Sequence, residues 1–398
     1  MELTDPPWRA RDGYPELIAA LGPAHARVVG GAVRDALLGR AADDLDLATA
    51  HPPDEVMRRL KAAGIRAAPT GLAHGTVTAV LPSGPVEVTT LRRDVATDGR
   101  HAEVVFTDDW REDAARRDFT INALYVDADG RIFDYFGGVD DLAARRVRFI
   151  GDPFRRIAED HLRILRFFRF QARFGKAIDQ PGLDACAARA NDLMALSRER
   201  IRDELLKLLV APRAVPVLRL MVDHGIWRPV LPEVDMAGVG RLAALATAEA
   251  DTGVAPAAVR RLAALLPPAA ADEVGARLKL SNADRKRLTA ATLGPGPEGP
   301  RALAYRVGSE SAVDRLLLAG ADPAVIAGWT PPRLPISGGA LVERGLRKGP
   351  AVAAALRAVE DRWIAEGFPD QPRVDEIADM IAAGAIVAQA ADASSGRA

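Results

Sequence analysis

Residues 28–49 read VVGGAVRDALLGRAADDLDLAT, and this stretch decides the fold. The apolar run Ala26–Val29 predicts a short strand, which Gly30-Gly31 would end in a tight turn. The residues that follow predict a short helix and then a second extended segment. Because residues two apart in an extended segment point to the same side, Asp44 and Asp46 would present two carboxylates to one point.

The residue types in this stretch suggest two complementary kinds of chemistry. Leu45 and Leu47 alternate with the aspartates and would face into a core. Two oxygen ligands aimed at one spot suit Mg²⁺, which takes one or two carboxylates and leaves other positions to water and substrate phosphates. Backbone N–H groups at Gly30 and Gly31, beside the start of a helix, suit a phosphate. Taken separately, such a glycine pair is most often a simple turn, and such acids most often a solvated edge.

The glycine pair and the aspartates, taken together in this order and at this spacing, are more specific for a protein family than the glycines or the aspartates alone. The stretch matches a pattern of two glycines, a spacer and a hydrophobic-D-x-D segment, and its wording GGAVRD, LLGR and DLDLAT resembles the class II tRNA nucleotidyltransferases and their poly(A) polymerase relatives. The resemblance implies an α+β protein with a polymerase-beta-like, mixed-sheet nucleotidyltransferase head, followed by an all-helical neck, body and tail. It also implies two Mg²⁺ ions at Asp44 and Asp46, and phosphate contacts from Gly30, Gly31 and Arg34.

Composition narrows the class of protein. The chain has 398 residues, 48% of them hydrophobic and 27% charged, which is ordinary for a globular protein of two or three domains. A net charge of −1 means that any RNA contact must come from local basic patches. The single cysteine, Cys186, excludes an intrachain disulfide and a cysteine-rich zinc site. With no apolar run near the ~18 residues that span a bilayer, and no signal peptide, we expect a cytoplasmic protein without membrane partners.

The resemblance and the turn-forming residues together predict the domain organisation. The expected parts are a leader over residues 1–25, the head over 26–144, a base-reading neck over 145–210, a body over 211–293, a linker over 294–300 with the sequence GPGPEGP, and a tRNA-binding tail over 301–398 whose last residues fray.

Two apolar, β-branched runs after a predicted helix at Pro52–Ala63 indicate a hairpin. They are Thr76–Leu81 and Val86–Leu91, separated by turn-forming residues. The resembled superfamily takes its third carboxylate from such a strand, which makes Glu87 the candidate, with a surface acid as the alternative. The polar segment Arg92–Phe106, interrupted by Asp98-Gly99, predicts a loop without regular structure, similar to the flexible loop of the family.

The block Arg116–Leu124, RRDFTINAL, predicts charged residues that enter a helix. The resemblance places Arg117 at the triphosphate or ribose, and Asp118 and Asn122 at the sugar. The alternative for Asp118 is a helix cap.

The segment Arg145–Lys176 is basic within a nearly neutral chain, with ten Arg or Lys residues against three acids. From Arg155 onward its pattern predicts one continuous helix with an apolar and an arginine-rich face. The alternative for the charged face is solvation, with Glu159 paired to Arg163. Arginine density favours nucleotide contacts instead, and Arg166 and Arg169 would add positive charge at the phosphates.

The motif EDHLR holds an acid and an arginine three residues apart, Asp160 and Arg163, and resembles the family motif that reads the incoming base. Cytosine and adenine each present an amine donor beside a ring-nitrogen acceptor. A carboxylate only accepts hydrogen bonds and a guanidinium only donates them, so this pair would match C and A and reject G and U. His161 falls on the apolar side and is expected to pack with a satisfied ring nitrogen.

The remaining motifs bear on the choice of activity. Leu196–Val210, with Ser197 as N-cap, predicts a neck helix. The resemblance implies addition of C, C and A to the 3′ end of tRNA from CTP and ATP, with release of pyrophosphate and with the tRNA acceptor arm as partner. The segment His74–Val80, HGTVTAV, favours this over the alternatives of a poly(A) polymerase or an A-only tRNA enzyme. A non-catalytic RNA-binding protein is a third, weaker reading.

Overall fold

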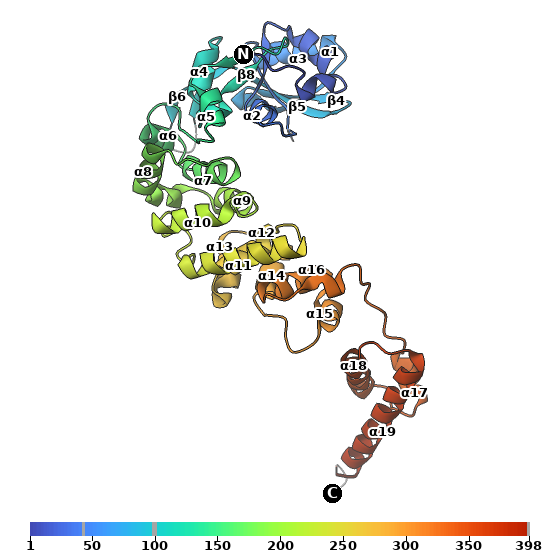
Figure 1. Ribbon diagram of the computed structural model, residues 1–398. Coiled ribbons are helices and arrows are strands. Elements are labelled where there is room, and N and C mark those ends of the chain that lie inside the picture. The colour runs from blue at the N-terminus through green and yellow to red at the C-terminus, as the bar shows by residue number, and fades with distance from the viewer. Residues whose placement is uncertain (42–43, 98–101, 396–398) are drawn as a thin grey trace. The chain divides into compact units, whose positions relative to one another are not determined.

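The head is built on a mixed β-sheet. The computed structural model describes residues 1–41, 44–97 and 102–395. Within them, seven strands form one sheet in the order β3-β4-β5-β2-β1-β8-β9, in which β2 and β5 run parallel and the other neighbours antiparallel. The sheet lies in the N-terminal part of the chain, where β4, β5 and β8 are labelled (Figure 1). The predicted mixed sheet is therefore confirmed. The strands are β1 Ala26–Val29, β2 Asp46–Thr49, β3 Arg66–Gly71, β4 Thr76–Leu81, β5 Gly84–Thr90, β8 Leu124–Val126 and β9 Ile132–Asp134.

The opening stretch folds largely as its pattern predicts. β1 ends at Gly30, α2 spans Gly31–Leu37, and β2 follows. Leu45 and Leu47 are fully buried, as their alternation requires. Asp44 lies just before β2 and is exposed, whereas Asp46 is its first residue and is half-buried. The two aspartates are thus at the entrance of the strand, where they remain open to a ligand.

The N-terminal residues belong to the head, which corrects their description as a leader. A 3₁₀ helix at Pro7–Ala10 and helix α1 at Tyr14–Leu21 bury Trp8 and Leu17 in the same core as Val28 and Leu47. Helix α3, Pro53–Ala62, packs beside α1. Burial of these apolar side chains gives the segment a stabilising role that its short sequence signal did not reveal.

Two expectations for the head's secondary structure are wrong. Residues 92–106 contain paired antiparallel strands, β6 Arg92–Thr97 and β7 Ala102–Phe106, instead of an irregular loop; Asp98 and Gly99 lie outside the described residues. The block RRDFTINAL follows helix α4, Trp110–Ala115, and forms only a 3₁₀ turn at Thr120–Asn122 before β8. Phe119 is held extended by pairing with Phe149, so a tertiary contact overrides the local helical pattern.

The neck is a set of helices that continues the same compact unit. They are α6 Pro153–Glu159, α7 Arg163–Arg173, α8 Gln180–Ala188 and α9 Arg198–Leu209, with α5 Gly138–Ala143 before them at the end of the head and α10 Ala214–Asp223 after them at the start of the body. The continuous helix expected from Arg155 is broken at Asp160, whose backbone is extended and whose carboxylate accepts the N–H of Leu162 at 3.1 Å. Buried rings of Phe119, Phe149 and Phe167 join the neck to the head. The predicted neck helix and its Ser197 cap are confirmed in α9.

Contacts divide the chain into two compact units, residues 1–239 with 276–280, and residues 240–275 with 281–398. This division falls inside the predicted body, while the predicted linker at 294–300 connects helices within the second unit. Helix α19 continues to Ser395, and residues 396–398 lie outside the described part, so the fraying of the last residues stays a prediction. Across both units the further helices are α11 Met236–Thr252, α12 Ala258–Leu265, α13 Ala271–Arg277, α14 Asn282–Ala291, α15 Pro300–Val307, α16 Ser309–Leu318, α17 Gly338–Glu343, α18 Pro350–Ala365 and α19 Gln371–Ser395.

The second unit has cores of its own. Trp363, Val359 and Ile377 are among the buried residues of one, and Leu303 and Leu316 of the other. Among the helices that the structure describes, none is both long and apolar enough to cross a bilayer.

Candidate active site

A turn at Gly30 connects the sheet to α2 and forms one wall of the site. Gly30 has φ 74° and ψ −122°, a conformation that residues with a Cβ avoid. Its N–H donates to the carbonyl of Leu124 at 3.1 Å, and its carbonyl accepts the N–H of Arg34 at 3.0 Å. Gly30 therefore shapes the turn, and its N–H is already engaged within the protein. The predicted phosphate contacts of Gly30 and Gly31 remain predictions; both glycines line the cavity described below.

The three candidate carboxylates belong to or directly precede the neighbouring strands β2 and β5. In the parallel register of β2 and β5, Asp46 is paired with Glu87, and Asp44 lies two residues before Asp46. Burial and the neighbouring charge of Glu87 raise the pKa of Asp46 to about 6, with Asp44 acting in the same direction and Arg117 against it. Glu87, identified from its strand position, is thus placed beside the predicted metal ligands.

The chemistry of these side chains fits a divalent cation. Repulsion between carboxylates raises a pKa because it disfavours the charged form, and a bound cation removes that repulsion. In the described part of the chain, no group of three or more His, Cys, Asp or Glu side chains is placed so that it could by itself hold a metal ion. An ion here would take its other ligands from water and substrate phosphates, which is the usual arrangement for Mg²⁺.

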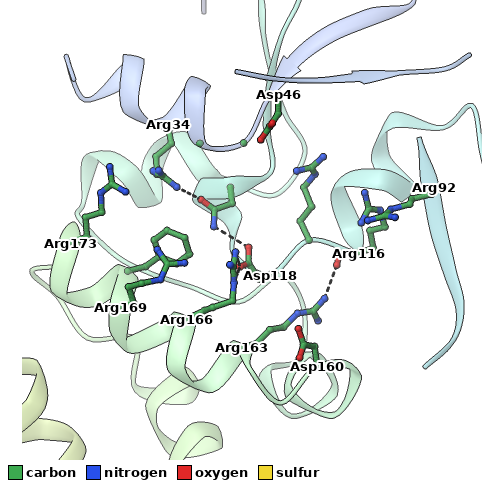
Figure 2. Close-up of a pocket in the computed structure, with 15 residues that line it drawn as sticks. Arg34, Asp46, Arg92, Arg116, Asp118, Asp160, Arg163, Arg166, Arg169 and Arg173 are labelled. Carbon is green, nitrogen blue, oxygen red and sulfur yellow. Dashed lines mark hydrogen bonds and ion pairs between the residues drawn. The ribbon is translucent and has the colours of Figure 1, made fainter. Parts of the chain in front are cut away.

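A cavity of about 530 Å³ opens beside Asp46 and is dominated by arginine (Figure 2). Its size is typical of a small-molecule site. Asp46, Asp118 and Asp160 are the acids that line it, so the lining carries a strong excess of positive charge. The eight arginines are Arg34, Arg92, Arg116, Arg117, Arg163, Arg166, Arg169 and Arg173. The structure therefore brings most head and neck candidates together at one cavity suited to a polyphosphate, whereas Asp44 and Glu87 are not among the residues that line it.

Asp113, which the sequence reading missed, anchors one side of the cavity. Its buried carboxylate accepts from Arg116 at 2.8 Å, from Arg117 at 3.2 Å and from the hydroxyl of Tyr125 at 2.6 Å. Burial raises the pKa of Asp113, but these partners hold it well below its usual range. The spacing of Asp113 to Arg116 and Arg117, three and four residues apart at the end of α4, was the available signal.

A chain of hydrogen bonds links Arg34 on α2 to Arg166 on α7 (Figure 2). Arg34 donates to Asn122 Oδ1 at 2.6 Å, Asn122 Nδ2 donates to Asp118 at 3.0 Å, and Arg166 Nε donates to Asp118 at 2.7 Å. Burial opposes ionisation of Asp118, yet Arg166, Asn122 and the N–H of Phe119 lower its pKa to about 2. Asp118 is therefore a charged link between head and neck, and the alternative of a simple helix cap is wrong. Asp35, also missed from sequence, binds Arg34 through two bonds of 3.0 Å.

Asp160 and Arg163 line the same cavity but do not pair with each other. Both oxygens of Asp160 accept from Arg200 Nη2 on α9, at 3.0 and 2.9 Å. Arg163 donates to Glu159 at 2.6 Å and to the carbonyls of Arg156 and Arg116 at 2.9 Å each. The Glu159–Arg163 ion pair considered as the alternative is present, and it fixes a guanidinium that still faces the cavity.

The remaining neck candidates are held by carboxylates and rings. Arg169 Nε donates to Glu204 at 2.5 Å, and its guanidinium lies 4.1 Å from the ring centre of Phe170. His161 Nδ1 lies 3.0 Å from the carbonyl of Ile157, which confirms its satisfied ring nitrogen.

A strand edge with paired carboxylates, a glycine turn and an arginine-lined cavity define a nucleotidyltransferase site. Comparison with known proteins agrees. Residues 26–148 match the model of the poly(A) polymerase head domain, and residues 177–237 match a model described as the probable RNA and SrmB-binding site of polymerase A.

Relatives extend the match over most of the chain. It is 36% identical over 383 residues to CCA tRNA nucleotidyltransferase 1, mitochondrial, of Homo sapiens, which covers 89% of this chain and 86% of that protein. It is 40% identical over 204 residues to the CCA-adding enzyme of Geobacillus sp. (strain WCH70), which covers 51% of this chain and 50% of that protein. The structure of the Bacillus stearothermophilus CCA-adding enzyme in complex with CTP has a TM-score of 0.74 and 29% identity, with 92% of this chain and 94% of that chain covered. The chain belongs to the family of tRNA nucleotidyltransferases and poly(A) polymerases and is an enzyme of that family.

Proposed function

We propose that this chain adds C, C and A to the 3′ end of tRNA, taking CTP and ATP and releasing pyrophosphate. One observation carries the proposal: the metal-binding candidate Asp46 and the base-reading candidates Asp160 and Arg163 line the same cavity. Relatives named for this activity, similar over most of both chains, support it.

Base choice rests on Asp160 and Arg163. The carboxylate of Asp160 accepts from the exocyclic amine of C or A, and the guanidinium of Arg163 donates to the adjacent ring nitrogen. Arg200 holds Asp160 through both carboxylate oxygens, and Glu159 holds Arg163, so each group is oriented before the nucleotide arrives. Guanine and uracil present the opposite donor and acceptor order and leave both protein groups unmatched.

The triphosphate is bound by the arginines of the cavity. Arg117, Arg166 and Arg169 supply positive charge from fixed positions, since carboxylates hold each guanidinium. Gly30 and Gly31 leave room for phosphate at the turn, and Arg34 lies beside them. Asp118 and Asn122 order this region through the chain of bonds between Arg34 and Arg166, next to the sugar.

Asp44 and Asp46 would hold two Mg²⁺ ions, with Glu87 as the third carboxylate. The ions, when bound, activate the primer 3′-hydroxyl and neutralise charge on the triphosphate. The helical tail would bind the tRNA. The cytoplasm stays the predicted compartment, although three relatives carry the word mitochondrial in their names.

Extension of tRNA that lacks its 3′ end tests the proposal directly. We expect growth by two residues with CTP alone and by three with CTP and ATP together. Addition of A alone, or of long A tails, would instead identify an A-only enzyme or a poly(A) polymerase. Binding of tRNA without any extension would identify a non-catalytic RNA-binding protein.

A further inference from the structure

A second, smaller cavity lies next to the active-site cavity. It has a volume of about 310 Å³ and is lined by Arg40, Arg169, Arg173 and Lys207, with Val210, Ala211 and Pro212 as an apolar wall. Arg169 and Arg173 also line the first cavity, so the two share a boundary. Among the residues that the structure describes, no carboxylate belongs to the lining of the second cavity, which favours an anion there.

Two cationic side chains of the second cavity differ from those of the active site in having no carboxylate partner among the described residues. Carboxylates hold most guanidiniums of the first cavity, as Glu204 holds Arg169. Arg40 and Lys207 are exposed, and neither forms an ion pair with a carboxylate in the part of the chain that the structure describes. They come from separate elements, the residues after α2 and the last turn of α9, yet converge on one cavity. Unpaired cations that converge in this way are available to an external anion.

Helix α7 connects this cavity to the base-reading end of the site. Arg163, Arg166, Arg169 and Arg173 line the two cavities along its length (Figure 2). At 1.5 Å per residue, Arg163 and Arg173 are separated by about 15 Å along the helix axis. A nucleic-acid strand advances about 3.4 Å per nucleotide, so this length corresponds to roughly four nucleotides. Because Arg163, Arg166 and Arg169 are assigned to the incoming nucleotide, the second cavity lies at the far end of this row, within reach of a strand a few nucleotides long.

We propose that the second cavity binds backbone phosphates of the primer strand a few nucleotides before its 3′ end. This inference rests on the proposed function. Arg40 and Lys207 contact the phosphates, while Val210 and Pro212 pack against ribose. The triphosphate is assigned to the first cavity because Asp46 and the glycine turn line that cavity and not the second.

Charge removal with a matched control tests the proposal. The variant R40Q/K207Q is compared with K61Q/R66Q, which removes the same two charge types from exposed positions elsewhere on the head. We expect the KM for tRNA to rise on the order of tenfold in R40Q/K207Q alone, with the KM for CTP within twofold of the control. The logarithm of tRNA affinity against the logarithm of salt concentration should lose about 0.7 in slope per lost contact. Equal affinities and slopes in both variants would overturn the proposal.

A phosphate scan identifies the ligand. In acceptor-arm RNAs, each of the last five internucleotide phosphates is replaced in turn by a neutral methylphosphonate. At least one replacement should weaken binding to the natural protein several-fold and weaken binding to R40Q/K207Q less than twofold. Equal losses in both proteins, or a raised inhibition constant for inorganic pyrophosphate in R40Q/K207Q, would refute a primer-phosphate site. Failure of the proposed function looks different, because the natural protein would then bind these RNAs but extend none of them with CTP.

Discussion

Asp118→Asn should remove a pH-dependent part of the head's stability. The Asp118 carboxylate is only 9% exposed and is bonded to Arg166 at 2.7 Å, to Asn122 at 3.0 Å and to the N–H of Phe119 at 2.8 Å. Its pKa falls from 3.8 to about 2, and at about 1.4 kcal/mol per unit this corresponds to about 2 kcal/mol of stabilisation at pH 7. Loss of the charge leaves Arg166 without its main partner, so we expect the variant to be about 2–4 kcal/mol less stable.

The sign of the pH dependence follows from the direction of this pKa shift. A carboxyl whose pKa is lowered by folding stabilises the protein above its unfolded pKa and loses that effect as the pH falls through its folded pKa. The stability difference between the natural protein and Asp118→Asn should therefore be constant from pH 7 to about 5. It should fall to about half by pH 3 and continue to shrink toward pH 2.

Urea unfolding at a series of pH values measures this difference. Asp129→Asn is the matched control, because Asp129 is an exposed carboxylate on the same head and its neutralisation should change stability by less than about 0.5 kcal/mol. A difference for Asp118→Asn that stays constant down to pH 3, or that is no larger than that of the control at pH 7, would refute the charged link between Asp118 and Arg166.

Three further substitutions test other parts of the site. Arg200→Gln releases Asp160 from its partner at 2.9 Å, so discrimination of CTP against UTP, measured as the ratio of kcat/KM, should fall about tenfold or more, with partial rescue by Arg200→Lys. Gly30→Ala forces a Cβ onto a backbone at φ 74° and should lower the free energy of unfolding by about 1–3 kcal/mol; an unchanged urea midpoint would contradict this. Glu87→Gln should lower kcat for CMP addition roughly a hundredfold at saturating Mg²⁺. If Glu87→Gln keeps the activity of the natural protein, Glu87 is a surface acid beside Asp46 and not a third catalytic carboxylate.

The elements that sequence predicted well are those set by local pattern. Alternation placed Leu45 and Leu47 in the core, and the cap at Ser197 located the start of α9. Both signals depend on neighbours a few residues away, which a sequence displays directly.

The features that sequence missed depend on distant partners. The helix break at Asp160 interrupts a regular periodicity, and Asp160 is bound by Arg200, forty residues later. The pairing of β6 with β7 likewise depends on cross-strand partners that no local pattern reveals. In the sequence, Asp113 looks like an ordinary surface acid. In the structure it is buried, because Arg117 and Tyr125 bind its carboxylate. Candidate residues were therefore easier to find than the groups that hold them in place.

Addition of CMP to tRNA by Asp46→Ala tests the central claim most directly, since this carboxylate is the proposed metal ligand that lines the arginine-rich cavity beside the glycine turn. Single-turnover extension with CTP and Mg²⁺ is measured beside retention of the same tRNA on a filter, with Asp129→Asn as the control. The account predicts that Asp46→Ala retains tRNA as well as the control does and adds no CMP. Extension by Asp46→Ala at the rate of the control would contradict it.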